Sequence, residues 1–391
     1  MVELLSERVS RIAPSATFAV KAKANALKAK GVDVLSFGLG EPDFDTPQHI
    51  KDAAKKALDE GFTKYTAAAG IPELREGIAS KMKEQNSVEC SAANIIVSNG
   101  AKHSLHNIFQ AMLNPGDEVI ILSPYWVSYL EQIKLSEGKP IIVDCDEQFQ
   151  PIPDKIREAI TDNTKMIVVN SPNNPTGAVF PKASLKAVAD IALENDVYIL
   201  SDECYENFVY GGAEHHSVAS LSPEIAEKTI TVNAFSKTFA MTGWRVGYAV
   251  APEPLVKAMS SLQGQTTSNV NSIAQKAVIA ALEGSLDDVK NMAKAFDERR
   301  KFAVDAFNSI DGVKCNKPEG AFYLFPYVDG LYTEKVKGSS AFCDFLLEEA
   351  HVALVPGVAF GLDSCVRFSC ASSLESIEKG LKQIKEATKA L

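Results

Sequence analysis

Between about Thr46 and Val250 the sequence alternates segments of helical periodicity with short runs of aliphatic and β-branched residues. Six runs predict strands, and helical patterns separate most of them. The runs are residues 95–97, 119–122, 141–143, 166–169, 197–200 and 230–232. This alternation is typical of an α/β fold in which helices cover both faces of a mainly parallel sheet. Ligands of such sheets bind beyond the carboxyl ends of the strands, so we expect functional side chains directly after the runs.

The flanking segments predict a second domain. One helix is expected to begin at Pro47, capped by Thr46, and to end before Gly61. After residue 285 the pattern changes. A long helix is expected over 286–309, followed by a mixture of shorter strands and helices that ends in a helix over 374–390. We therefore predict a large domain of residues 46–285 and a smaller α+β domain formed by residues 1–45 and 286–391.

Composition excludes several classes of function. The 40 Lys and Arg residues against 50 Asp and Glu give a net charge of −10 without a basic block, which disfavours binding to nucleic acid or to anionic membranes. The seven cysteines are scattered and contain no Cys-x-x-Cys pair, which favours a reducing compartment. The amino terminus lacks the pattern of a secretory signal, and no apolar run approaches the ~20 residues of a spanning helix. We expect a cytoplasmic protein that acts on small molecules.

Common catalytic signatures are missing from the sequence. The six histidines include no His-Glu-x-x-His, and His103 and His106 stand at helical spacing, where packing or solvent exposure is expected; no metal site is predicted. The sequence also contains no nucleotide phosphate loop, no Gly-x-Ser-x-Gly elbow and no Gly-x-Gly-x-x-Gly after the first strand.

Polar residues follow four of the predicted strands. Gly100 lies in the first of these segments, where it opens a helix whose backbone amides and dipole would face an anion. The others offer an Asn amide in a rigid turn, a carboxylate with a phenol three residues on, and a lysine with an arginine eight residues beyond it. Each alone has an ordinary explanation as a tight turn, loop, helix cap or surface lysine. The segments are 98–102, 170–177, 201–205 and 233–237, the last followed by 243–247.

In this order the segments resemble the fold-type I pyridoxal-phosphate (PLP) enzymes, and the chain is similar to class I aminotransferases of the aspartate aminotransferase family, bacterial subgroup. The resemblance extends from Gly38–Phe44 through Val366–Ser369. It implies a seven-stranded, mainly parallel sheet in the large domain and PLP as cofactor. Tyr65 matches the position that reaches the phosphate in the partner subunit, which implies a homodimer with shared active sites.

The resemblance gives catalytic roles to three residues. Lys237 would bond the cofactor through its amine and act as a general base once substrate displaces it. Asp202 would keep the pyridine nitrogen protonated, so that the ring can accept electrons when the substrate Cα–H bond breaks. Tyr205, assisted by Asn174, would hydrogen-bond the phenolic oxygen of the ring.

The remaining cofactor contacts are implied in the same way. Trp126 would stack on the pyridine ring, with core packing as the alternative. The chain departs from the family at Ala234, where a hydroxyl residue is common, so one phosphate hydrogen bond is expected to be absent and cofactor retention to be weaker. The phosphate would be held by Arg245, Ser236 and the amides of Gly100, Ala101 and Lys102.

The substrate contacts point to a dicarboxylic amino acid. Arg367 would grip the α-carboxylate, assisted by Gly40, Asn174 and Trp126. In the bacterial subgroup a lysine and a threonine bind the distal carboxylate, and Lys102 and Thr17 occupy the matching positions. The resemblance thus implies transfer from L-aspartate to 2-oxoglutarate by ping-pong kinetics. The alternatives are prephenate, aromatic or other neutral substrates, a carbon–sulfur β-lyase, and the ligand-sensing domain of a transcription regulator.

Overall fold

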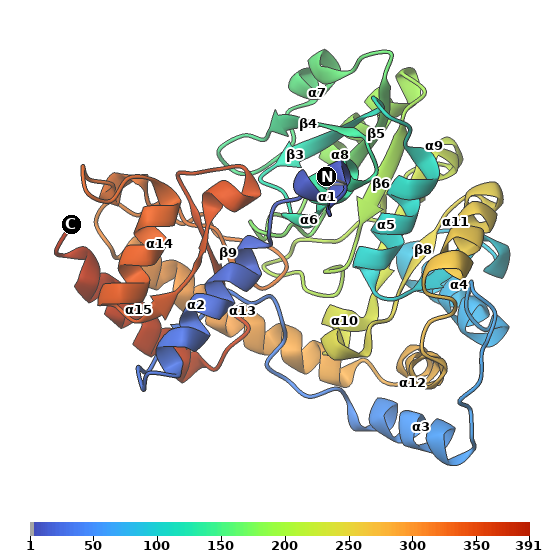
Figure 1. Ribbon diagram of the computed structural model, residues 1–391, viewed down its shortest axis with the longest axis horizontal. Helices are drawn as coiled ribbons and strands as arrows, with labels where there is room; N and C mark the ends of the chain where they lie inside the picture. Colours follow the sequence, from blue (N-terminus) through green and yellow to red (C-terminus); the bar gives the residue numbers. More distant parts are fainter. Residues whose placement is uncertain (1–3) are drawn as a thin grey trace.

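Seven strands of the computed structural model, which describes residues 4–391, form one sheet in the order β2-β8-β7-β6-β5-β3-β4 (Figure 1). The strands are β2 Ile95–Ser98, β3 Glu118–Ser123, β4 Lys139–Asp144, β5 Thr164–Asn170, β6 Tyr198–Asp202, β7 Thr229–Ala234 and β8 Gly247–Val250. The six predicted strands and the fold class are confirmed. The seventh, β8, is antiparallel to both β2 and β7, while the other pairs are parallel.

Helices cover both faces of this sheet. Successive residues of a strand point to opposite faces. Accordingly, Val119 and Ile121 of β3 pack in a cluster with residues of α5, α6 and α11, whereas Ile120 and Leu122 pack in another with residues of α7, α8 and α9. The helices of this part are α3 Gln48–Asp59, α4 Pro72–Asn86, α5 Ala101–Met112, α6 Ser128–Leu135, α7 Pro153–Ala159, α8 Lys182–Glu194, α9 Pro223–Lys228, α10 Phe235–Thr238, α11 Glu253–Thr266 and α12 Ser272–Glu283.

The predicted start of α3 is wrong in one detail. Pro47 occupies the N-cap position, so Thr46 lies one residue too early to cap the helix. Its hydroxyl instead donates to the carbonyl of Ala240 at 2.8 Å and accepts from Nε1 of Trp244 at 3.0 Å. Thr46 therefore ties the entry to α3 to the segment that follows α10.

The amino-terminal segment packs with the carboxyl-terminal third of the chain, and α2 lies near α14 and α15 in Figure 1. Strand β1 pairs in parallel with β10, and β11, β12 and β9 form an antiparallel sheet. The predicted helices over 286–309 and 374–390 are confirmed as α13 and α15. The elements are α1 Glu7–Ser10, α2 Ala16–Lys28, β1 Leu35–Ser36, α13 Asp287–Asn308, β9 Tyr323–Leu324, α14 Gly338–Glu349, β10 Val352–Ala353, β11 Val355–Pro356, β12 Val366–Ser369 and α15 Leu374–Thr388.

One apolar cluster connects the two groups of elements. It contains Ile95 of β2 together with Phe368 of β12, so the core does not mark a boundary between them. The division into residues 46–285 and the two flanking segments stays a prediction, and residues 1–3 of its first segment lie outside the described part. Among the helices of residues 4–391, none has the length and apolar character needed to cross a membrane.

Candidate active site

A cavity of about 540 Å³ lies at the carboxyl ends of the central strands. Most of the predicted site residues line it, although they come from elements far apart in the sequence. They are Thr17, Gly40, Ala101, Lys102, Trp126, Asn174, Asp202, Tyr205, Ser236, Lys237, Arg245 and Arg367. Gly100 directly precedes this lining at the start of α5. Tyr65 does not reach the cavity: it lies between α3 and α4 with 89% of its surface exposed.

Asp202 is the last residue of β6 and is 4% exposed. Its carboxylate accepts hydrogen bonds from the Tyr129 hydroxyl at 2.6 Å and from the Cys204 amide at 3.2 Å. Burial raises the pKa of Asp202, and these hydrogen bonds act in the opposite direction. Tyr129 is a functional contact that sequence reasoning missed, although it follows Trp126 by three residues at helical spacing.

Lys237 lies in α10, directly after β7, and its amine donates to the carbonyl of Gly40. Burial lowers the pKa of Lys237 to about 8, with the charges of Arg367 and Arg245 contributing in the same direction. A lysine with this pKa carries a neutral amine far more often than a surface lysine does. It is therefore suited to bond a carbonyl carbon and to accept a proton.

A hydrogen-bonded chain joins the two groups of elements across the cavity. The hydroxyls of Tyr205 and Tyr323 lie 2.8 Å apart, and Asn174 Nδ2 donates to Tyr205 at 3.5 Å. Arg367 donates from Nη1 to Asn174 Oδ1 at 2.9 Å and from Nη2 to the Gly38 carbonyl at 2.7 Å. Within residues 4–391 the buried Nε of Arg367 has no partner. Because Arg367 also lines the cavity, its fixed guanidinium is placed to meet a carboxylate there.

The start of α5 and Arg245 form an anion-binding corner. Arg245 has a left-handed backbone (φ +60°) and donates to the carbonyls of Thr242 at 2.8 Å and Asn99 at 3.2 Å. A Cβ atom on Gly100, which has φ +82°, would lie only 2.5 Å from Nη2 of Arg245. Glycine therefore allows the arginine to approach the amides that open α5, and buried Ser236 lines the same cavity.

Lys102 supplies a cation at the exposed side of the cavity, in addition to the buried Arg367. Its Nζ lies 5.2 Å from the ring centroid of Trp126. The ring centroids of Trp126 and Tyr129 lie 5.4 Å apart in an edge-to-face arrangement. Burial and then the charge of Arg245 lower the pKa of Lys102. Thr17 reaches the same cavity from α2. The site therefore combines buried Arg367 with Lys102, two cations that can meet two carboxylates.

The donor set fits PLP, the cofactor that the sequence resemblance implies. Arg245 and the α5 amides suit a phosphate, and Lys237 suits an aldehyde carbon. Buried Asp202 suits a ring nitrogen that must stay protonated. Arg367, which Asn174 and the Gly38 carbonyl hold in place at the cavity, remains for the substrate rather than for the cofactor.

Comparisons with known proteins agree with this geometry. Residues 32–384 match the family described as aminotransferase class I and II. A probable aspartate/prephenate aminotransferase of Aquifex aeolicus is 50% identical over 387 residues, 98% of each chain. An aspartate aminotransferase of Geobacillus stearothermophilus is 47% identical over 383 residues, 97% of this chain and 98% of the relative. The solved structure of aspartate aminotransferase from Thermus thermophilus with maleate superposes with a TM-score of 0.94 at 45% identity, covering 99% of this chain and 100% of that one.

Proposed function

Because the chain belongs to the family of class I and II aminotransferases, we propose that it moves the α-amino group of L-aspartate to 2-oxoglutarate, giving oxaloacetate and L-glutamate. The observation that carries this proposal is the placement of Arg367 and Lys102 in one cavity with Lys237 and Asp202. The Thermus thermophilus relative was determined with maleate, a dicarboxylic acid, which supports a dicarboxylic substrate.

The residues divide the work of the reaction. PLP, the cofactor of this family, supplies when bound an electron sink for the carbanion left by breaking the substrate Cα–H bond. Lys237 bonds the cofactor and, once displaced, accepts the α-proton on Nζ. Asp202 keeps a proton on the ring nitrogen. Tyr205 and Asn174 hydrogen-bond the phenolic oxygen, and Trp126 covers the ring face.

The remaining residues bind and orient. Arg245, Ser236 and the amides of residues 100–102 hold the phosphate. Arg367 holds the α-carboxylate, with Gly40 beside it, and Lys102 and Thr17 hold the distal carboxylate. Because the first product leaves before the second substrate binds, the kinetics should be ping-pong, and Lys237 bonds the cofactor again only after the second half-reaction.

The first test is the visible absorption spectrum of the purified protein before and after L-aspartate is added without an oxo acid. A band that changes with L-aspartate supports the cofactor, its bond to Lys237 and the acidic substrate together. A band that does not change with L-aspartate would contradict L-aspartate as the substrate. The absence of a band after reconstitution with PLP would contradict the proposal that the protein is an aminotransferase. Lys237→Ala should abolish turnover, since it removes the proton acceptor.

The distal contact is tested by Lys102→Ala. This variant should lose about 1.5–3 kcal/mol of transition-state stabilisation with L-aspartate, the contribution of one charged hydrogen bond, and little with L-phenylalanine. The measurement is kcat/KM for both substrates, with Lys134→Ala, a lysine of α6 outside the cavity lining, as the matched control. Equal losses for both substrates would remove Lys102 from this role.

Prephenate is the second candidate acceptor, favoured by the name of the Aquifex aeolicus relative. Amination of prephenate with L-aspartate or L-glutamate as donor would establish it. Pyruvate release from cystathionine would instead favour the β-lyase alternative.

We also propose a homodimer in which Tyr65 completes the phosphate site of the partner subunit. The exposure of its side chain in the single chain supports this role. Subunits carrying Lys237→Ala and subunits carrying Tyr65→Ala should together regain about a quarter of wild-type activity, because each mixed dimer contains one intact site. The control mixes Lys237→Ala with the variant that carries both changes, and no gain in the first mixture would contradict shared sites.

A cytoplasmic location is part of the same proposal. All seven cysteines are free, which suits a reducing compartment.

Ala234, buried at 4% exposure, offers no hydroxyl to the phosphate, so cofactor retention should be weaker than in relatives with a hydroxyl there. Ala234→Ser should lower the dissociation constant of PLP, measured by equilibrium dialysis; an unchanged constant would contradict this.

A further inference from the structure

A network of buried charges lies behind the segment that carries Asp202 and Tyr205. Lys81 of α4 is 8% exposed and forms an ion pair with Glu206, whose side chain is also 8% exposed. Asn86, at the end of α4, accepts from Lys81 at 2.8 Å and donates to the other oxygen of Glu206 at 2.7 Å. Both carboxylate oxygens of Glu206 are therefore held by α4.

Glu203 anchors the same segment from within. It is 1% exposed and accepts from the hydroxyls of Ser201 at 2.8 Å and Ser217 at 2.9 Å. His215 lies 3.4 Å from its second oxygen. Burial alone would lower the pKa of His215, but the hydrogen bond and charge of Glu203 outweigh it, and the net direction is upward. His215 and Lys81 thus balance the two carboxylates.

This arrangement distinguishes the cluster from a metal centre. Ligand atoms of Glu203, Glu206 and His215 lie within 4.8 Å of one another, as they would around a metal ion. The ammonium of Lys81 already contacts Glu206 and supplies the positive charge there. A divalent cation would have to displace this ammonium. We therefore interpret the cluster as a restraint on the segment 202–206, which lies between these charges and the large cavity.

The side chains of the segment 202–206 point either into the large cavity or into the network. Asp202, Cys204 and Tyr205 line the large cavity, whereas Glu203 and Glu206 belong to the network. Strand pairing fixes Asp202, which lies opposite Asn170 and Val232, and the Glu203 amide donates to the Val232 carbonyl at 2.9 Å. The chain then continues as a turn, so strand pairing does not fix Tyr205. The side chains of the network provide that restraint.

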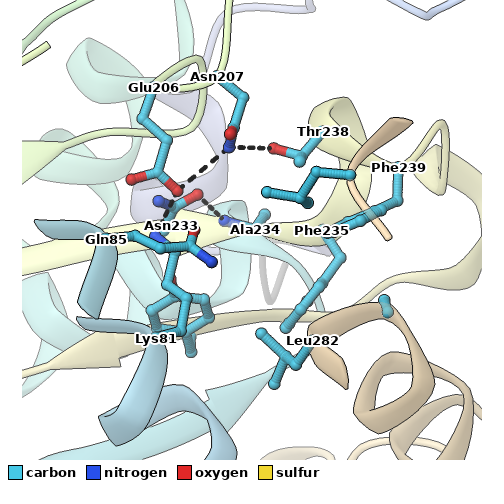
Figure 2. A pocket seen from close by; sticks show the side chains of 13 residues that line it. Lys81, Gln85, Glu206, Asn207, Asn233, Ala234, Phe235, Thr238, Phe239 and Leu282 are labelled. Carbon is cyan, nitrogen blue, oxygen red and sulfur yellow. Dashed lines mark hydrogen bonds and ion pairs between the residues drawn. The ribbon is translucent and has the colours of Figure 1, made fainter. Parts of the chain in front are cut away.

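The network also reaches the lysine segment. Asn207 donates to the Thr238 hydroxyl at 3.2 Å, and Thr238 follows Lys237 in α10. Figure 2 shows Glu206 and Asn207 on one side of a small cavity and Phe235, Thr238 and Phe239 on the other. This cavity has a volume of about 30 Å³, and within residues 4–391 the buried Nδ2 of Asn233 has no partner. The hydrogen bond between Asn207 and Thr238 is therefore a polar contact between the two segments at the edge of this cavity.

We propose that Lys81 and Glu206 are a positioning pair for the aminotransferase reaction, which holds Tyr205 in register with Asp202 and Lys237. A role in stability alone explains the pair poorly, because a buried ion pair contributes little compared with apolar residues of similar size. The inference rests on the proposed function and deepens it, since it names residues that act on the reaction without touching cofactor or substrate.

The test is the double variant Lys81→Met/Glu206→Gln, assayed as holoenzyme. It leaves no unpaired charge and keeps a side chain that Asn86 can bind, so the protein should fold. We expect kcat with L-aspartate to fall about tenfold or more while KM changes less than about twofold. We also expect the pH midpoint of the cofactor absorption band to move by about half a unit or more, because Asp202 and Tyr205 set the charge on the ring.

The matched control is Lys139→Met/Glu118→Gln, which removes an ion pair at the amino ends of β3 and β4 whose carboxylate is also 8% exposed. It should leave kcat and the midpoint unchanged. Wild-type values in Lys81→Met/Glu206→Gln would overturn the positioning role while leaving the proposed function intact, since the wild-type band and its response to L-aspartate test that function separately. If the double variant does not fold, Glu206→Asp, which keeps the charge but shortens the side chain that reaches α4, is judged by the same two readouts.

Discussion

The hydroxyl of Tyr129 gives the sharpest test of how the cavity controls Asp202. Tyr129 is 1% exposed and donates to the carboxylate at 2.6 Å. Tyr129→Phe removes this donor and leaves the Cys204 amide at 3.2 Å. A hydrogen bond to a charged group contributes about 1.5–3 kcal/mol. Since one pKa unit corresponds to about 1.36 kcal/mol, the pKa of Asp202, already raised by burial, should rise by roughly one to two further units.

The consequence should appear in kcat rather than in KM. A carboxylate with a higher pKa holds a proton on the ring nitrogen less firmly, and the reaction depends on that proton most in the transition state. We expect kcat to fall about tenfold to hundredfold, by the same 1.5–3 kcal/mol. KM for L-aspartate should change little, because Arg367 and Lys102 are untouched. Single-turnover kinetics with L-aspartate at saturating PLP measure the step directly.

Tyr125→Phe is the matched control. Tyr125 is also a buried tyrosine, at 5% exposure, and precedes Trp126 without belonging to the cavity lining. It should retain wild-type kcat. A kcat for Tyr129→Phe within about twofold of wild type, with cofactor saturation verified, would refute the reasoning.

Three further outcomes follow from the site. Because only the neutral amine of Lys237 can bond PLP and its pKa is about 8, the rate at which the apoprotein regains its absorption band should rise with pH and level off above about 8; a rate still climbing near 10.5, the ordinary lysine value, would contradict this. Gly40→Ala would place a Cβ against the Tyr323 hydroxyl, so kcat/KM should fall about hundredfold, and an unchanged value would reject the close approach. Arg367→Lys loses the planar fork that also holds the Gly38 carbonyl, so KM for L-aspartate should rise about tenfold or more; an equal rise for an amine without a carboxylate would reject the assignment.

The sheet could be predicted where burial on both faces imposes continuous aliphatic runs. Five strands have such runs, and the edge strand β4 has a run over 141–143 although most of its residues are not buried. By contrast, β8 reads Gly247-Tyr248-Ala249-Val250 and lacks a run although it is buried. Its position between β2 and β7 depends on pairing with strands from both ends of the domain. The role of Thr46 was missed for a related reason, since its partners Ala240 and Trp244 lie almost 200 residues away.

The cavity was predictable to the extent that its residues follow strands. Asp202 ends β6, and Asn174 and Lys237 follow within a few residues of the ends of β5 and β7; the carboxyl ends of these parallel strands share one edge of the sheet. Tyr129 and Tyr323 were not found, because their hydrogen bonds to Asp202 and Tyr205 span 73 and 118 residues. No local pattern encodes such contacts.

The missed Tyr129 explains why burial acts with less opposition on the amine than on the carboxylate of the same cavity. Burial favours the neutral form of both groups, raising the pKa of Asp202 and lowering that of Lys237. Asp202 is surrounded by donors, Tyr129 and the Cys204 amide, which favour its charged form and oppose the effect of burial. Lys237 contacts the neutral carbonyl of Gly40 instead, so burial prevails there. The residue types select the reaction, and the distribution of donors around them determines how strongly the effect of burial on each pKa is opposed.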